Sequence, residues 1–148
     1  MNLGIFLKLL LAVLFGGAVG LERELSGKPA GLRTNILICV SATMMMALAD
    51  IPIGGKDLGG EAMKVAAGII TGVGFLGAGA IIQAGGAVHG LTTASTIWAV
   101  AALGLVLGSG HYALAAVFTL IIILTLSLLR KVEGFIARKK GREPHPEH

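Results

Sequence analysis

Charged residues are scarce in this sequence, and their scarcity excludes most classes of soluble protein. Only 14% of the residues are Asp, Glu, Lys or Arg, whereas a soluble globular domain has about 25%. Between Ala62 and Leu129 the only charged residue is Lys64. Hydrophobic residues make up 55% of the chain, and its mean hydropathy is +0.86. The composition therefore predicts a membrane protein that crosses the bilayer several times.

Several patterns of chemically reactive residues are also missing. The single cysteine, Cys39, cannot form an internal disulfide, and we expect it to be a small buried apolar residue. No nucleophile–base pair and no cluster of metal ligands stands out, so we predict no enzymatic activity, no metal site and no cofactor. A basic C-terminal stretch has no nucleic-acid-binding motif beside it. Anionic lipid is therefore a better expected partner than nucleic acid.

Long apolar runs define the predicted fold, because a spanning helix needs about 20 predominantly apolar residues. The fold class is an all-α membrane protein with five transmembrane helices, predicted at Leu3–Leu21, Thr34–Ala49, Ala62–Gln83, Leu91–Leu107 and Tyr112–Leu129. Residues 1–130 form the expected transmembrane domain, and residues 131–148 form a basic cytoplasmic tail with no soluble domain after it. In this tail, Val132, Phe135 and Ile136 predict a short amphipathic surface helix that is followed by disorder.

The distribution of Lys and Arg predicts the orientation in the membrane. If the N-terminus is outside, nine of the twelve basic residues lie on the inner side and three on the outer side. Because inner loops are enriched in Lys and Arg, this asymmetry predicts an N-out, C-in topology.

Glycine recurs at helical spacing in the first and third predicted spans. In a bilayer such glycines allow the backbones of two helices to approach closely. We therefore predict helix packing at Gly16, Gly20, Gly68, Gly72, Gly74, Gly77 and Gly79. The glycines near the end of the fourth span (Gly104, Gly108 and Gly110) are instead interpreted as loosening that end.

Polar residues gather at two turns that this topology places on the cytoplasmic side. The candidate cluster consists of Glu22, Arg23, Glu24, Arg33, Thr34, Asn35, Thr92, Thr93 and Ser95. One interpretation is an ordinary charged stop at the membrane surface. The other is a structured site in which a carboxylate of the first turn pairs with Arg33 or with a cation. Thr34 or Asn35 is the expected cap of the second helix.

Two other polar stretches are interpreted as solvated loops. Asp50, Asp57 and Glu61 carry hard oxygen ligands of the kind that Mg²⁺ prefers, but their spacing fits no cation-binding loop. His89 can titrate near neutral pH, yet it lies in a glycine-rich loop where exposure is the simpler account.

An internal repeat relates the two polar turns. A shift of 59 positions aligns Gly20, Gly27, Gly31, Leu32 and Thr34 with Gly79, Gly86, Gly90, Leu91 and Thr93. We therefore hypothesise two duplicated helical hairpins and one extra span, with the two polar turns packed side by side.

Three motifs in order resemble the MgtC/SapB family of bacterial membrane proteins. They are G-x-E-R-E…G-K-P-A-G-L-R-T-N from Gly20 to Asn35, G-V-G-F-L-G-A-G-A-I-I from Gly72 to Ile82, and G-L-T-T-A-S-x-I-W-x-x-A-A-x-G from Gly90 to Gly104. The resemblance implies an inner-membrane protein linked to growth under magnesium limitation, to stress adaptation and to virulence. For some members it also implies inhibition of the F-type ATP synthase. Some members have Asn at the position of Thr92, which makes ATP synthase a weaker expected partner.

Two functional hypotheses follow from these observations. The first is a regulator that acts by helix–helix contact with another membrane protein or with a second copy of itself. The second is a transporter of Mg²⁺ or protons, or an accessory to one, with Glu22, Arg33 and the hydroxyl-bearing turn at a cytoplasmic mouth.

Overall fold

The computed structural model describes residues 3–49, 62–84 and 87–139, and these residues contain five helices that are long and apolar enough to cross a membrane. The predicted number of spans is therefore confirmed. In chain order the elements are α1 (Leu3–Leu25), α2 (Leu32–Ala49), α3 (Ala62–Gly79), β1 (Ile82–Ala84), β2 (Ala87–His89), α4 (Leu91–Gly108) and α5 (Tyr112–Lys139).

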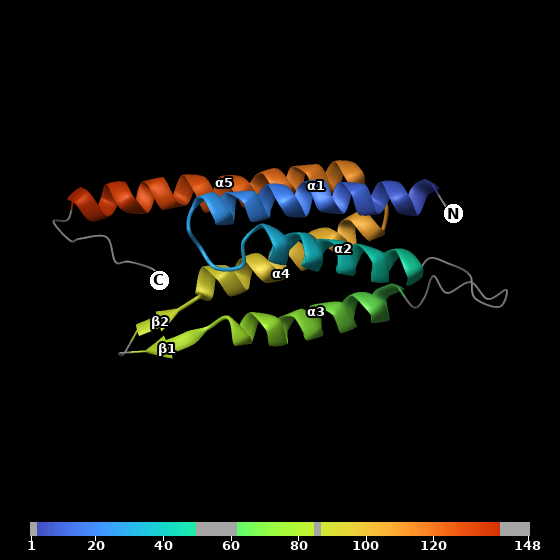
Figure 1. Ribbon diagram of the computed structural model, residues 1–148, viewed down its shortest axis with the longest axis horizontal. Helices are drawn as coiled ribbons and strands as arrows, with labels where there is room; N and C mark the ends of the chain where they lie inside the picture. The colour runs from blue at the N-terminus through green and yellow to red at the C-terminus, as the bar shows by residue number, and fades with distance from the viewer. Residues whose placement is uncertain (1–2, 50–61, 85–86, 140–148) are drawn as a thin grey trace.

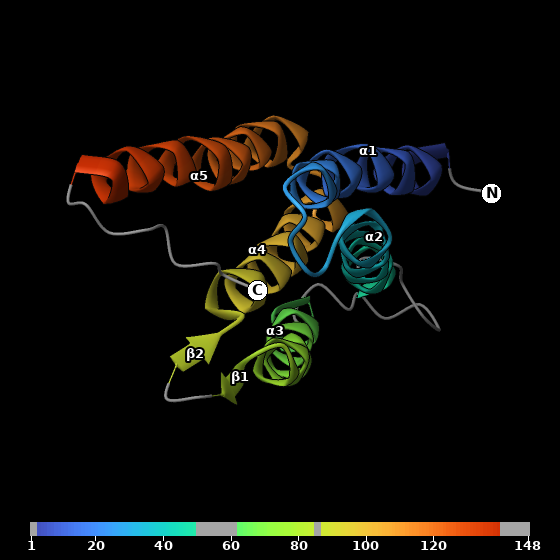
Figure 2. The same cartoon turned by 60° about the vertical axis from the view of Figure 1, so that its left-hand side comes forward.

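The helices run roughly alongside one another in three layers (Figures 1 and 2). Helices α2 and α4 form the middle layer, α1 and α5 lie on one side of it, and α3 lies on the other. At one end of the bundle α1 ends, α2 and α4 begin, and the two short strands lie beside them. We call this end the hairpin end.

The buried core excludes α3. It consists of small and branched residues from the other four helices, namely Ala12, Val19, Cys39, Val100, Leu103, Leu107, Ala115 and Ile122. The outward faces carry many large exposed apolar side chains, most of all on α1 and α5. Such faces are expected where a helix contacts lipid, since lipid tails solvate apolar side chains.

Glycines bring the core helices into close contact. A Cβ added at Gly16 would lie 2.7 Å from the Cβ of Cys39, and one at Gly20 would lie 2.8 Å from the Cα of Leu32. A Cβ added at Gly104 would lie 2.6 Å from the carbonyl oxygen of Cys39. Any larger residue at these positions would push α1 or α4 away from α2.

The interpretation of Gly104 and Gly108 as loosening residues is therefore wrong. A Cβ at Gly108 would lie 2.8 Å from the carbonyl oxygen of Thr43. In addition, the Thr43 hydroxyl donates a hydrogen bond of 3.1 Å to the carbonyl oxygen of Gly104. The pair forms a small-xxx-small contact like the one predicted for Gly16 and Gly20.

Glycines of α3 behave differently. A Cβ added at Gly68, Gly72, Gly74 or Gly79 would meet nothing within 4 Å, and only Gly77 approaches another helix, with its added Cβ 3.6 Å from the carbonyl oxygen of Ala94. The helix packing predicted at Gly68, Gly72, Gly74 and Gly79 is therefore not found among the described residues. Contact of the same face with another molecule stays a prediction.

The structure also corrects three helix ends. Helix α1 continues to Leu25, four residues beyond the predicted end at Leu21. Helix α3 stops at Gly79 rather than Gln83, because Gln83 pairs with Val88 in an antiparallel hairpin of β1 and β2. Helix α5 continues without a break to Lys139, so Val132 belongs to the fifth helix and not to a separate surface helix. The remainder of the predicted tail, residues 140–148, lies outside the described residues.

Candidate functional site

Arg23 is the buried charge at the hairpin end. It lies in the last turns of α1, and only 4% of it is exposed. Its guanidinium donates one hydrogen bond of 2.7 Å to the Thr93 hydroxyl and one of 3.3 Å to the Pro29 carbonyl oxygen. Because Thr93 belongs to α4, the structure brings together the two polar turns that the repeat relates.

Gly90 allows the start of α4 to approach the end of α3. Its φ is +85°, a left-handed conformation that glycine adopts without strain. A Cβ at this position would overlap the carbonyl group of Ala80. Gly90 has no side chain, and no side-chain cap bonds to the first turn of α4 among the described residues. The first N–H groups of α4 thus carry the partial positive charge of a helix N-terminus.

Glu22 and Glu24 have different roles. Glu22 accepts a hydrogen bond of 2.8 Å from the Ser26 hydroxyl and lies 3.6 Å from the guanidinium of Arg130 on α5. Glu24 is exposed, and its carboxylate accepts the N–H of Leu32 at 3.0 Å. A carboxylate at the start of α2 is favourably placed in the helix dipole.

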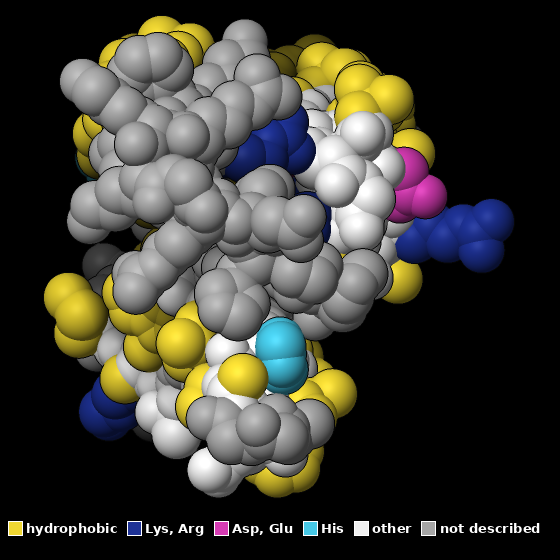
Figure 3. Space-filling model, turned by 90° about the vertical axis from the view of Figure 1, so that its left-hand side faces the viewer, with side chains coloured by type: hydrophobic (Ala, Val, Ile, Leu, Met, Phe, Trp, Pro, Cys, Tyr) yellow, Lys and Arg dark blue, Asp and Glu magenta, His cyan; other side chains and the backbone are white. Residues whose placement is uncertain are grey.

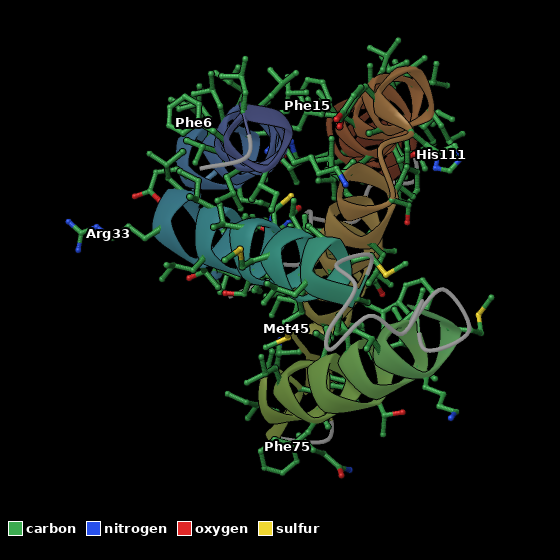
Figure 4. All side chains as sticks on the ribbon, turned by 90° about the vertical axis from the view of Figure 1, so that its right-hand side faces the viewer. Phe6, Phe15, Arg33, Met45, Phe75 and His111 are labelled. Carbon is green, nitrogen blue, oxygen red and sulfur yellow. The ribbon has the colours of Figure 1, made fainter. Side chains whose placement is uncertain are left out.

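Arg33 does not take part in this network. Its side chain is exposed and points away from the bundle (Figure 4). The predicted ion pair of Arg33 with Glu22 or Glu24 is therefore wrong for the part of the chain that the structure describes. Sequence distance suggested that pair, but the helical turn of α2 directs Arg33 outward while α1 directs Arg23 inward.

Asn35 holds the turn between α1 and α2. It is fully buried, and its amide nitrogen donates hydrogen bonds to the carbonyl oxygens of Ala30 and Gly31. Ala30 has a φ of +54°, which is unusual for a residue with a side chain. Thr34 is exposed. The expected cap of α2 by Thr34 or Asn35 is thus replaced by the carboxylate of Glu24.

The hydroxyls of the second turn divide between two faces of α4. Thr93 is buried against Arg23, whereas Thr92 and Ser95 are exposed. The Ser95 hydroxyl donates a hydrogen bond of 2.9 Å to the carbonyl oxygen of Leu91 in its own helix. Among these three residues, only Thr93 links α4 to another helix through an observed side-chain hydrogen bond.

A small cavity of about 70 Å³ lies at this junction. Its lining residues are Arg23, Lys28, Pro29, Val88, His89, Gly90, Leu91, Thr92 and Thr93. Figure 3, a view onto this side of the molecule, shows Lys or Arg side chains above a histidine. Sequence reasoning placed neither Lys28 nor His89 in the site. The available signal was their position next to Pro29 and Gly90, the residues that turn the chain.

A larger apolar groove of about 700 Å³ lies between α2 and α3. Its lining residues are Leu37, Ile38, Ser41, Ala42, Met45, Leu48, Val65, Gly68, Ile69, Gly72, Val73 and Leu76. Met45 lies on the side of α2 that faces α3, whereas Phe75 points away from the groove (Figure 4). Gly68 and Gly72 thus form part of a wall that the described residues leave uncovered.

Within the described residues there is no group of three or more His, Cys, Asp or Glu side chains that could hold a metal ion. Asp50, Asp57 and Glu61, the acidic loop considered above, lie outside the described residues.

Comparison with known proteins identifies relatives of the whole helical bundle. Residues 9–135 match the MgtC family model. An Escherichia coli K12 protein named "Putative magnesium transporter YhiD" is 38% identical over 85% of this chain and 60% of its own length. Protein MgtC of Brucella abortus is 41% identical over 88% of this chain and 54% of its own length. Protein SrpB of Synechococcus elongatus is 37% identical over 88% of this chain and 78% of its own length.

The chain thus spans less than two thirds of the length of its Escherichia coli and Brucella relatives. No solved structure matches the chain.

Proposed function

Because this chain belongs to the MgtC family, we propose that it is a multi-pass inner-membrane protein that regulates another membrane protein by direct helix contact. The regulation is linked to growth under magnesium limitation, to stress or to virulence. One observation carries the proposal: among the described residues, the groove between α2 and α3 is uncovered, is lined mainly by apolar residues and includes two glycines in its wall.

The position of α3 supports this function. It stands outside the core, and its only close glycine contact is that of Gly77 with Ala94. Gly68 and Gly72 lie one helical turn apart on the groove side, where they would allow a second backbone to approach. Because a Cβ added at Gly68 or Gly72 would meet nothing within 4 Å among the described residues, this face of α3 has room for another helix.

The expected occupant is an apolar transmembrane helix of a different protein. The groove offers one hydroxyl, that of Ser41, and is otherwise lined by apolar residues. A helix without charged residues in its central turns would fit this lining, since charges in the membrane interior are costly. A second copy of this chain and the membrane sector of an F-type ATP synthase are the other occupants that the experiment distinguishes.

A matched pair of substitutions tests the proposal. Gly72→Leu fills the groove, whereas Gly74→Leu makes the same change on the same helix outside the groove lining, at a position equally free of contacts. Each variant carries a photo-crosslinking residue in place of Met45. Cross-linked products in native membranes are measured together with growth in low-magnesium medium.

We expect Gly72→Leu to abolish both the cross-link and the growth phenotype, while Gly74→Leu retains them at equal abundance. A cross-linked band of twice the chain mass would identify self-association, and one containing a subunit of ATP synthase would identify that partner. If Gly72→Leu retained the cross-link and the phenotype as fully as Gly74→Leu, the proposed contact would be refuted.

Transport of Mg²⁺ or protons is the second candidate function, and the name of the Escherichia coli relative favours it. The described site argues against a cation path at the hairpin end, because Arg23 places a buried positive charge there. Such a charge raises the barrier for any cation that passes nearby. Flux of Mg²⁺ or protons down a gradient through the reconstituted protein would establish transport. The regulatory proposal would be overturned if the Gly72→Leu variant then carried the same flux.

A further inference from the structure

We propose that the small cavity at the hairpin end binds the phosphoryl group of an anionic ligand. This inference is independent of the proposed helix contact, because the cavity and the α2–α3 groove have no lining residue in common.

Positive charge is the first argument. Two cationic side chains, those of Arg23 and Lys28, line the cavity together with the imidazole of His89. No Asp or Glu is among the residues that line it. Arg and Lys form the strongest hydrogen bonds to phosphate oxygens, since both partners are charged.

Neutral donors on α4 complete the lining. Thr92 and Thr93 line the same cavity together with Gly90 and Leu91, and the Thr93 hydroxyl accepts a hydrogen bond from Arg23 there. The first turn of α4 supplies N–H groups there without a side-chain cap. Tetrahedral oxyanions bind well where cationic side chains, hydroxyls and the N–H groups of a helix start converge.

The size of the cavity limits the ligand. Pockets for drug-sized ligands have volumes of about 300–1,000 Å³, whereas this cavity has about 70 Å³. It can therefore take a single phosphoryl group, but not the base and sugar of a nucleotide. The rest of a larger ligand would have to lie outside the cavity.

Two sources of a phosphoryl group fit this position. The cavity lies at the end of helices that are long and apolar enough to cross a membrane. The ends of such helices are expected near the lipid headgroups, so an anionic phospholipid could supply the phosphoryl group. Free phosphate in the adjacent aqueous phase carries the same chemistry. The lining of the cavity favours a phosphoryl group, and the following experiment distinguishes phospholipid from free phosphate as its source.

Calorimetric titration of the full chain in phospholipid-free maltoside micelles tests the proposal. The probes are inorganic phosphate, short-chain dihexanoyl phosphatidylglycerol and, as a zwitterionic comparison, dihexanoyl phosphatidylcholine. Lys28→Gln removes one cavity cation and leaves the Arg23–Thr93 hydrogen bond in place. Arg33→Gln is the matched control, because it removes the same charge from an exposed position at the same end of the bundle.

We expect Lys28→Gln to weaken binding by about tenfold or more, which is the usual loss for a hydrogen bond to a charged group, and Arg33→Gln to change it little. Binding of phosphatidylglycerol alone supports a lipid source, and binding of phosphate supports a soluble one. The proposal is overturned if neither phosphate nor phosphatidylglycerol binds. It is also overturned if phosphate does not bind and phosphatidylcholine binds as tightly as phosphatidylglycerol, or if Lys28→Gln and Arg33→Gln weaken binding equally.

Discussion

Replacement of Gly104 by alanine should destabilise the bundle more than any comparable change on α3. The added Cβ would lie 2.6 Å from the Cys39 carbonyl oxygen, 2.7 Å from the Cβ of Ala42 and 3.2 Å from the Thr43 backbone nitrogen. None of these atoms is at the end of a flexible side chain, so relief requires a shift of α4 away from α2. That shift would also stretch the 3.1 Å hydrogen bond from Thr43 to the Gly104 carbonyl oxygen.

The magnitude follows from two destabilising effects and one stabilising effect. Overpacking a tight contact costs about 1–3 kcal/mol, and rigid backbone neighbours favour the upper half of that range. A side-chain hydrogen bond between membrane helices contributes about 0.6 kcal/mol on average. Alanine gains about 1 kcal/mol over glycine in intrinsic helix propensity. We therefore expect Gly104→Ala to lower the free energy of unfolding by about 2 kcal/mol.

Reversible unfolding in mixed micelles of maltoside and dodecyl sulfate measures this change. Trp98 is the only tryptophan and lies on α4, so its fluorescence reports on the helix that carries the substitution. Gly74→Ala is the control, because its added methyl group meets nothing within 4 Å. Propensity alone should leave this control unchanged or up to about 1 kcal/mol more stable.

The comparison can refute the packing argument. If Gly104→Ala and Gly74→Ala unfold at the same detergent composition, α4 does not approach α2 as closely as described. A parallel loss of stability in both variants would point to a general intolerance of methyl groups, and the argument from close contact would fail.

Three further outcomes are expected, each measured by the same unfolding assay. A double-mutant cycle of Arg23→Met and Thr93→Val should give a coupling free energy of about 1–2 kcal/mol, since one partner of this buried hydrogen bond is charged; additive single changes would contradict the contact. Gly90→Ala should destabilise by at least about 1 kcal/mol, because its φ of +85° and the adjacent Ala80 carbonyl both disfavour a side chain. Arg130→Gln should change stability by no more than about 1 kcal/mol, since the Arg130 side chain is 46% exposed in its ion pair with Glu22; a larger loss would show that this pair is shielded from water.

The five spans were predictable from the sequence because lipid imposes a simple requirement. Apolar runs near 20 residues long must form helices, since the bilayer interior offers no other partner for backbone N–H and C=O groups. The predicted beginnings of α1, α3, α4 and α5 therefore agree with the structure. The end of α3 was missed because Gln83 continues the apolar run, while only pairing with Val88 reveals a strand.

Helix partners were not predictable in the same way. Glycine spacing shows where two backbones are able to approach, but it does not say which helix is opposite. Gly16 and Gly104 both face α2, whereas Gly68 and Gly72 border an open groove, although their sequence patterns are alike. Which helix lies opposite a given glycine depends on how the side chains of the neighbouring helices pack together. That packing is a property of the assembled bundle.

The apolar runs alone were enough to predict a helical membrane protein with five spans and polar residues at two of its turns. The packing of the helices was needed to show that Arg23, rather than Arg33, lies buried between those turns and donates to Thr93. Both arginines are close to a helix end, and sequence cannot distinguish them. The position of a residue along its helix sets the direction in which its side chain points. The packing of α1 and α4 on α2 then decides which of these directions faces the interior.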